Sequence, residues 1–171
     1  MLKIVGALLF ISATSFIGMD YSQQLTKRPQ QIKMLIQSLR LLEAEMGYSQ
    51  LPLQQIFYTL SNQLTSPVAL FYEGLAKELS MITEDFLIIW DKEVSKLQEQ
   101  SNLKSSELDI LRQFGRHIGH HTFNEQEKHI TLTIYYLQHE LEEANEIKQK
   151  YEKVAKSLGV LIGIFIVLLL F

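Results

Sequence analysis

Apolar residues gather at the two ends of the chain, and most polar residues lie between them. Residues 2–19 form an almost unbroken apolar run, and residues 158–171 form a second one. A run of about 18 apolar residues is near the lower limit for a helix that crosses ~30 Å of hydrocarbon. The pattern predicts an N-terminal transmembrane helix over residues 1–20, a helical domain over residues 21–155 and a C-terminal transmembrane helix over residues 156–171.

Each apolar run also has an alternative interpretation. Lys3, a short apolar core and small residues at 12–15 are typical of a signal peptide, which would make the protein an exported, cleaved helical adaptor. The apolar stretch continues through Met19, however, which favours a membrane helix. Fourteen apolar residues at the other end rise only about 21 Å. A span from Val154 would reach about 27 Å if Lys156 extends its amine to the headgroups, and a segment that enters one leaflet is the alternative.

The positive charges that flank the apolar runs predict the orientation in a membrane. The outer flanks offer little besides Lys3. The inner flanks carry many more basic residues, namely Lys27, Arg28, Lys33, Lys148, Lys150, Lys153 and Lys156. The positive-inside rule therefore places the middle domain in the cytoplasm and both termini outside the cell membrane.

Between the two ends, apolar residues recur every three or four positions, which predicts helices. The first stripe follows Pro29, ends at Gly47 and comprises Ile32, Leu35, Ile36, Leu39, Leu42 and Met46. The last one runs from Asn124 without a break into the C-terminal apolar run and predicts one helix of about 45 residues. No alternating stretch bounded by hairpin turns is present. We therefore expect an all-α helical bundle.

Proline, glycine and short polar side chains predict where the helices begin and end. Gly115 is expected to close a short helix, as glycine often does. The expected helix starts are Pro52, Pro67 after an N-cap Ser66, Glu84 and Asp85 after Thr83, Ser105 or Ser106, and Asn124 with Glu127 three residues later.

Composition argues against several function classes. The net charge is −3, so the chain lacks the excess of basic residues that most nucleic-acid-binding proteins have. The chain has no Cys, so disulfides, thiol chemistry and Cys-based metal sites are excluded. Neither a GxxxxGK[ST] phosphate loop nor a GxSxG nucleophile motif occurs. We therefore expect a protein that is not an enzyme and that needs no cofactor.

Three histidines, His117, His120 and His121, form the one cluster that suggests metal chemistry, because imidazole is the commonest metal ligand. They lie in a connection that contains Gly115 and Gly119, no acidic ligand lies close by before Glu125, and the spacing is not HExxH. A solvated loop is the favoured interpretation. A metal-binding membrane enzyme built on these histidines remains an alternative.

The predicted long helix carries two further patterns. His139, Glu140, Glu142 and Glu143 lack the Glu-x-x-His repeat of di-metal bundles, so we expect a solvated charged face. Gly159 and Gly163 form a GxxxG pattern, which lets two helices approach closely. Self-packing or a homo-oligomer is therefore open.

Several short motifs occur in order along the whole chain. They are Arg28-Pro29-Gln30-Gln31-Ile32, Leu42-Glu43-Ala44-Glu45-Met46, Tyr48, Leu51-Pro52-Leu53, Phe114-Gly115, Gly119, Gln126, Tyr151, and Ser157-Leu158-Gly159-Val160-Leu161 with Gly163. In order, spacing and flanking apolar runs, the chain resembles the stage III sporulation protein AB family of endospore-forming bacteria.

The resemblance implies a mother-cell membrane protein of the channel complex built across the double membrane of the engulfed forespore. Its middle domain would be similar to the helical domain of type II secretion F and pilus platform proteins. Its partners would be a secretion-type ATPase of the same operon, other membrane subunits and membrane lipid, with no nucleic acid. One departure is His120-His121-Thr122, where the family pattern leads us to expect a loop with Ser or Asp.

For partner contact we select four charged surface residues that lie in the first predicted helix or just before it: Arg28, Lys33, Glu43 and Glu45. The two glutamates are of interest because they end an otherwise apolar helix. Charged residues of this kind more often form ion pairs within a bundle, which contribute little at a surface.

Overall fold

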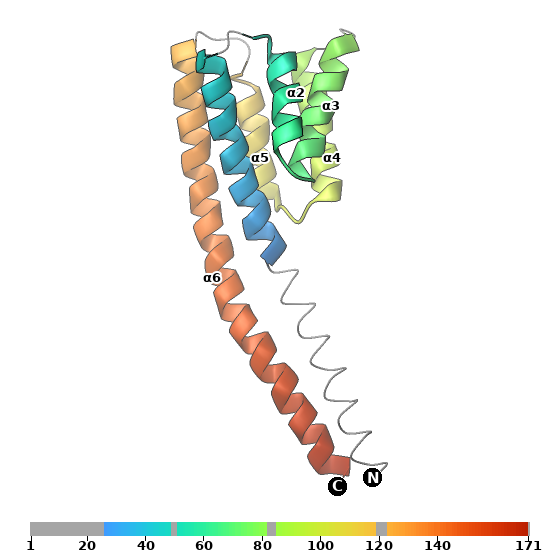
Figure 1. Ribbon diagram of the computed structural model, residues 1–171. Coiled ribbons are helices and arrows are strands. Elements are labelled where there is room, and N and C mark those ends of the chain that lie inside the picture. The colour runs from blue at the N-terminus through green and yellow to red at the C-terminus, as the bar shows by residue number, and fades with distance from the viewer. Residues whose placement is uncertain (1–25, 49–50, 82–84, 119–122, 171) are drawn as a thin grey trace. The chain divides into compact units, whose positions relative to one another are not determined.

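The computed structural model describes residues 26–48, 51–81, 85–118 and 123–170, and every regular element in these ranges is a helix (Figure 1). The predicted all-α class is confirmed. The elements are a first helix over residues 26–48, α2 (Leu53–Gln63), α3 (Val68–Met81), α4 (Phe86–Gln100), α5 (Ser105–Gly115) and α6 (Phe123–Leu170).

Packing divides the chain into two units. One comprises residues 30–142, and the other comprises residues 1–29 together with 143–171. The first unit is the helical bundle, and it lies inside the predicted domain of residues 21–155. The boundaries fall inside the first helix and inside α6.

The predicted membrane segments have no support from the described part of the chain. Residues 1–20, with their signal-peptide alternative, lie outside it. Residues 156–170 continue α6 as helix. Over the residues that are described, no helix combines the length and the apolar character needed to cross a membrane. Both transmembrane helices stay predictions.

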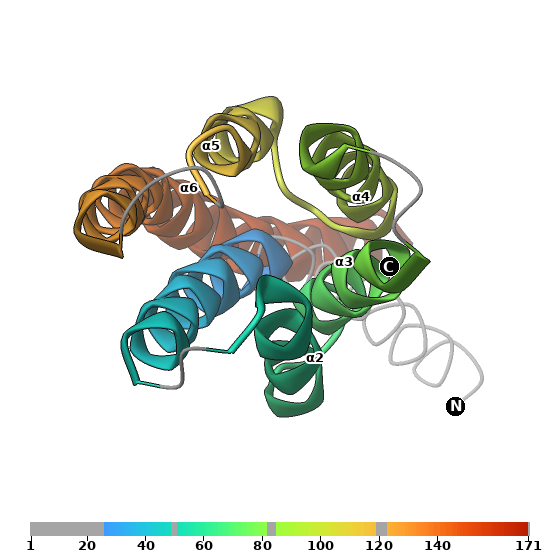
Figure 2. The same ribbon diagram turned by 90° about the horizontal axis from the view of Figure 1, so that it is seen from above.

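Within residues 30–142, consecutive helices run in opposite directions and pack against their neighbours in the sequence. α2 contacts α3, α3 contacts α4, and α4 contacts α5. Figure 2 shows the ends of these four helices following one another around the bundle in chain order. Short connections favour this arrangement because a helix that follows a short loop lies antiparallel to the helix before it and packs beside it.

The first helix buries the stripe that the sequence predicts. Ile32, Leu35, Leu39 and Leu42 are fully buried. The helix does not end at Gly47 but includes Tyr48. Ser38 interrupts the apolar stripe, and its hydroxyl lies 3.0 Å from the hydroxyl of Tyr72 on α3. This hydrogen bond joins two helices through a polar contact in the core.

Aromatic rings fill the space where α2, α3, α4 and α5 meet. Trp90 on α4 is the centre of the group, and its indole N–H donates to the Leu111 carbonyl of α5 at 2.8 Å. Its ring centroid lies 5.2–6.2 Å from the centroids of Phe57, Phe71, Phe86 and Phe114. Tilted and edge-on pairs at such distances add to the stabilisation from burial alone.

Gly115 has a different role from the expected one. It is the last residue of α5, as predicted, but it is buried against Trp90. A Cβ at this position would lie 2.5 Å from Nε1 and 2.6 Å from Cγ of the indole ring. Glycine is therefore required here for close packing, and the helix continues into a turn at Arg116 with right-handed backbone angles.

The predicted helix starts are displaced by one or two residues. Pro52 and Pro67 precede α2 and α3 rather than opening them, and Ser66 lies further outside. Asp85 is the N-cap of α4, because its side chain accepts a hydrogen bond from the Leu87 N–H at 3.4 Å. Thr83 and Glu84 lie outside the described residues.

The starts of α5 and α6 also differ from expectation. Neither Ser105 nor Ser106 caps α5, which has Lys104 as its N-cap residue. The Lys104 N–H donates instead to the buried carboxylate of Glu107 at 2.6 Å. Asn124 lies inside α6, since the helix already includes Phe123. The 48 residues of α6 confirm the predicted long helix.

Candidate partner-binding site

The four charged residues predicted for partner contact do not form one patch. Lys33 is exposed, whereas Glu43 and Glu45 are half-buried. Because positions two residues apart are about 200° apart around a helix, Glu43 and Glu45 point to nearly opposite sides. Lys33 and Glu45 are separated by about 18 Å along the helix axis at 1.5 Å per residue. Their part in partner binding stays a prediction.

Arg28 is mostly buried, and its guanidinium lies 3.8 Å from the carboxylate of Glu143 on α6. Both residues belong to the unit that contains the two ends of the chain. This ion pair gives Arg28 a structural role between the first helix and α6. A partner could reach this guanidinium only through its small exposed fraction, 11% of the side chain.

The histidine cluster is only partly described. His120 and His121 lie outside the described residues. His117 follows α5, and its ring stacks on that of His129 in α6, with centroids 3.9 Å apart and planes 6° from parallel. In the described ranges, no group of three or more His, Asp or Glu side chains could hold a metal ion.

The acidic residues of α6 are more than a solvated face. Glu140 accepts a hydrogen bond from the Ser106 hydroxyl of α5 at 2.9 Å. Glu143 pairs with Arg28. Glu142 is exposed, as expected for a charged face.

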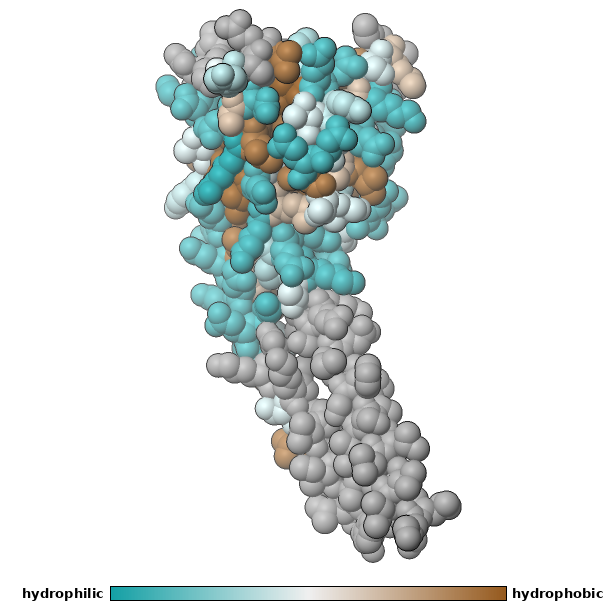
Figure 3. Space-filling model, in the orientation of Figure 1, coloured by the Kyte–Doolittle hydropathy of each residue, from teal (hydrophilic) through white to brown (hydrophobic). Residues whose placement is uncertain are grey.

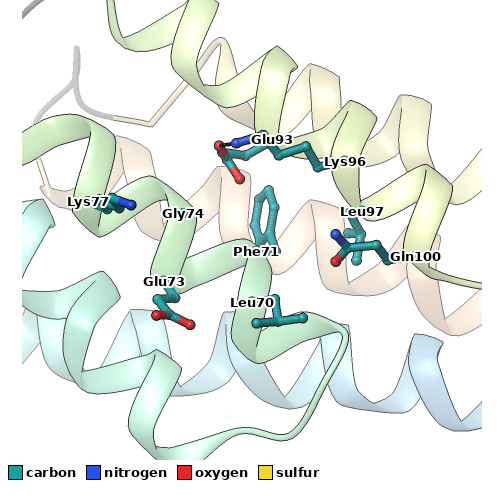
Figure 4. A pocket seen from close by; sticks show the side chains of 9 residues that line it. All are labelled: Leu70, Phe71, Glu73, Gly74, Lys77, Glu93, Lys96, Leu97 and Gln100. Carbon is teal, nitrogen blue, oxygen red and sulfur yellow. Dashed lines mark hydrogen bonds and ion pairs between the residues drawn. The ribbon is translucent and has the colours of Figure 1, made fainter.

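A cavity between α3 and α4 is a feature that the sequence analysis missed. Its volume is about 250 Å³ (Figure 4). Phe71 and Leu97 form its apolar floor. The complete lining is Leu70, Phe71, Glu73, Gly74 and Lys77 of α3 with Glu93, Lys96, Leu97 and Gln100 of α4.

Glu93 is the unusual residue of this cavity because it is only 2% exposed. Its Oε1 accepts a hydrogen bond from Lys96 Nζ at 2.6 Å. The carboxylate lies directly over Gly74, where any Cβ would overlap it. The absence of a side chain at Gly74 therefore makes room both for the carboxylate and for the cavity beside it.

The sequence does contain a signal for Glu93. It lies on the apolar face of α4, three residues after Trp90 and four before Leu97, where a core residue is expected. A carboxylate at such a position is seldom buried unless it is paired. Gly74 in the middle of α3 is a second signal, since glycine weakens a helix interior and usually has a packing reason.

A nearby ion pair on the same two helices is more exposed. Lys92 Nζ of α4 lies 3.0 Å from Glu78 Oε1 of α3. The hydrogen bond from Lys92 lowers the pKa of the Glu78 carboxyl below its usual value, with smaller contributions from the charges of Lys92, Lys96 and Lys77. This pair joins α3 and α4 at the surface, where such pairs contribute little to stability.

The fold and the cavity between α3 and α4 define an all-α helical bundle protein. Comparison with known proteins gives the family. The family model described as stage III sporulation protein AB matches residues 3–171. The chain belongs to the stage III sporulation protein AB family, a family of the sporulation process.

Two similar proteins support this assignment. Stage III sporulation protein AB of Bacillus subtilis (strain 168) is 34% identical over 170 residues, which cover 99% of each chain. A solved structure of a stage III sporulation protein AB superimposes with a TM-score of 0.68 at 30% identity. That match covers 72% of this chain and 98% of the solved one. The predicted family is confirmed.

Proposed function

We propose that the protein is a non-enzymatic platform subunit of the channel complex between mother cell and forespore, and that it presents its helical bundle to a secretion-type ATPase. The observation that carries the proposal is the family match over residues 3–171. An assembly subunit needs surfaces rather than a reaction centre, and the face of the bundle seen in Figure 3 mixes hydrophilic residues with apolar ones.

We further propose that the protein lies in the mother-cell membrane facing the forespore, with its middle domain in the cytoplasm. The apolar runs at residues 2–19 and 158–171 and the basic residues on their inner flanks support this placement. A topology reporter fused after residue 100 should give a cytoplasmic signal. A second reporter after Phe171 should give an external one, and an external signal at residue 100 would contradict the platform role.

The partner contact can be tested with the ATPase of the same operon. Full-length protein in detergent micelles is immobilised, and capture of the purified ATPase is measured. Charge reversal by Glu43→Lys with Glu45→Lys should abolish capture while helix content, followed by circular dichroism, stays unchanged. If capture survives, the surface assignment of Glu43 and Glu45 is wrong.

A matched control separates the loss of the negative charges from the introduction of positive ones. The double variant Glu43→Gln with Glu45→Gln removes charge but keeps side-chain shape, so it should weaken capture less than the reversal. Failure of the unaltered protein to capture the ATPase at low salt would contradict the proposed function itself. Low salt is needed because contacts between exposed charges are screened over about 10 Å at 0.1 M ionic strength.

A further inference from the structure

The helix α2 differs from the other described helices because it carries no charged residue. The charge-free stretch extends over residues 46–72 of the sequence. The outer face of α2 is nevertheless open to solvent, since Gln55 and Asn62 are exposed and Tyr58 is 63% exposed. Charged residues are depleted and tyrosine is enriched at the centres of protein–protein interfaces. The composition of this face is therefore that of an interface centre.

The two helices beside α2 carry opposite charges. Figure 2 shows α2 between the first helix and α3 on one side of the bundle. On the first helix, the exposed charged side chains of residues 30–44 are both basic, Lys33 and Arg40. On α3, the first charged residue is Glu73, which is exposed. The neutral face of α2 therefore has a basic flank on one side and an acidic group on the other.

Three residues of this face lie at nearly the same level along the bundle. Thr65, just after α2, donates from its hydroxyl to the sulfur of Met34 on the first helix at 3.4 Å, which fixes a common starting level. From there Arg40 lies six residues, or about 9 Å, along the first helix. Tyr58 lies about 10 Å back along α2, and Glu73 lies about 7.5 Å into α3. Arg40, Tyr58 and Glu73 thus form a row across three helices.

We propose that this face binds a second copy of the chain, in a parallel dimer whose two-fold axis runs along α2. In a two-fold interface the same surface of both subunits meets, so a side chain near the axis contacts its own copy. A charge near the axis would therefore meet a like charge, and the neutral face of α2 avoids this repulsion. Tyr58 of one copy packs against Tyr58 of the other.

The charges beside α2 match those of a second copy only in the parallel arrangement. Rotation about an axis along α2 exchanges the two flanks, so Arg40 of each copy faces Glu73 of the other at the same level. An antiparallel pair would instead place Arg40 opposite Arg40, which is repulsive. Lys77, about 6 Å beyond Glu73, faces the uncharged Ala44 in the parallel pair. Among the described residues, neither Arg40 nor Glu73 forms an ion pair within its own chain.

Disulfide cross-linking tests the arrangement directly, because the chain has no Cys and each introduced cysteine reports on one position. Full-length Gln55→Cys and Asn62→Cys proteins in detergent micelles are oxidised with copper phenanthroline, and the linked dimer is measured on a non-reducing gel. Both should cross-link, because each position on the facing side of α2 meets its own copy in a parallel pair. Glu99→Cys, exposed on α4, is the control and should stay monomeric.

Charge variants test the flanks, with the dimer dissociation constant measured by analytical ultracentrifugation in micelles. Arg40→Glu should weaken the dimer about tenfold, because the two-fold axis repeats each lost ion pair. Adding Glu73→Arg exchanges the two charges and should restore the affinity. Tyr58→Arg places two like charges at the axis and should abolish the dimer. Glu99→Gln should leave the dissociation constant unchanged.

The proposal is overturned by any of four results. These are a monomeric unaltered protein, a dimer that cross-links at neither position 55 nor position 62, equal cross-linking at position 99, or no rescue of Arg40→Glu by Glu73→Arg. The second result is expected if the GxxxG pattern of Gly159 and Gly163 holds the dimer instead. None of these results bears on capture of the ATPase through Glu43 and Glu45, so the two proposals fail separately.

Discussion

Replacing Gly115 with alanine should destabilise the bundle through a single methyl group. The new Cβ would lie 2.5 Å from Nε1 and 2.6 Å from Cγ of Trp90. The indole cannot turn aside easily, because its N–H donates to the Leu111 carbonyl and four phenylalanine rings surround it. Either Trp90 moves or the end of α5 does.

The expected cost follows from the contacts that would change. Overpacking a well-filled core typically costs about 1–3 kcal/mol. A strained or broken Trp90–Leu111 hydrogen bond adds roughly 0.5–1.5 kcal/mol. Alanine has a higher helix propensity than glycine, which offsets at most about 1 kcal/mol of this loss of stability. We therefore expect Gly115→Ala to lower the free energy of unfolding by about 2–3 kcal/mol, as the combined effect of these terms.

Urea denaturation of the full-length protein in micelles measures this cost. Trp90 is the only tryptophan of the chain, so its emission reports on this cluster alone. Gly47→Ala is the matched control, since Gly47 is exposed near the end of the first helix and should gain up to about 1 kcal/mol. If Gly115→Ala unfolds like the unaltered protein and keeps its emission maximum, the packing role of Gly115 is refuted.

Three further predictions concern polar contacts. Ser38→Ala should lower the free energy of unfolding by about 1–3 kcal/mol, because it leaves the buried Tyr72 hydroxyl without its partner. Adding Tyr72→Phe to Ser38→Ala should restore part of this loss. Urea denaturation measures both effects. The pKa of the Glu78 carboxyl is lowered in the folded state, so its contribution to stability is present above its unfolded pKa and is lost as the pH falls through the folded pKa. Lys92→Gln should raise that pKa in an NMR titration, and an unchanged titration would contradict the assignment. Burial raises the pKa of Tyr72 well above its usual range, so its hydroxyl should not ionise until the bundle unfolds in alkali. Ultraviolet absorbance during an alkaline titration measures this ionisation.

Periodicity predicted the helical class and the core residues well. The stripe from Ile32 to Leu42 is buried, and the unbroken pattern after Asn124 is one long helix. These features depend on many residues acting together, so no single side chain decides them. Burial of apolar surface then selects the face that the pattern marks.

Helix ends were predicted less accurately, because one side chain decides each of them. The buried carboxylate of Glu107 binds the Lys104 N–H, so no serine is needed at the start of α5. The role of Gly115 was missed for a related reason. A glycine at a helix end is usually a stop signal, and the sequence does not show that Trp90, 25 positions earlier, lies against it.

The α3–α4 cavity could not be predicted, since it depends on two helices crossing at one particular register. Gly74 and Glu93 are each unusual in their own helix, but only the packed structure brings the carboxylate over the glycine. The predicted partner residues stood out for a different reason, the charge at the ends of a stripe. That signal does not distinguish an exposed Lys33 from a mostly buried Arg28.

The contacts of the first helix have a consequence for the order in which the chain folds. The side-chain carbonyl of Gln31 accepts a hydrogen bond from the Asn102 N–H, 71 positions later. The Ser38 hydroxyl forms its hydrogen bond with Tyr72, 34 positions later. Contacts between α2, α3, α4 and α5 join neighbours in the sequence and form early, because short loops close at little entropic cost. We therefore expect the first helix, although made first, to dock only after α2, α3 and α4 have formed, once the connection between α4 and α5 has left the ribosome.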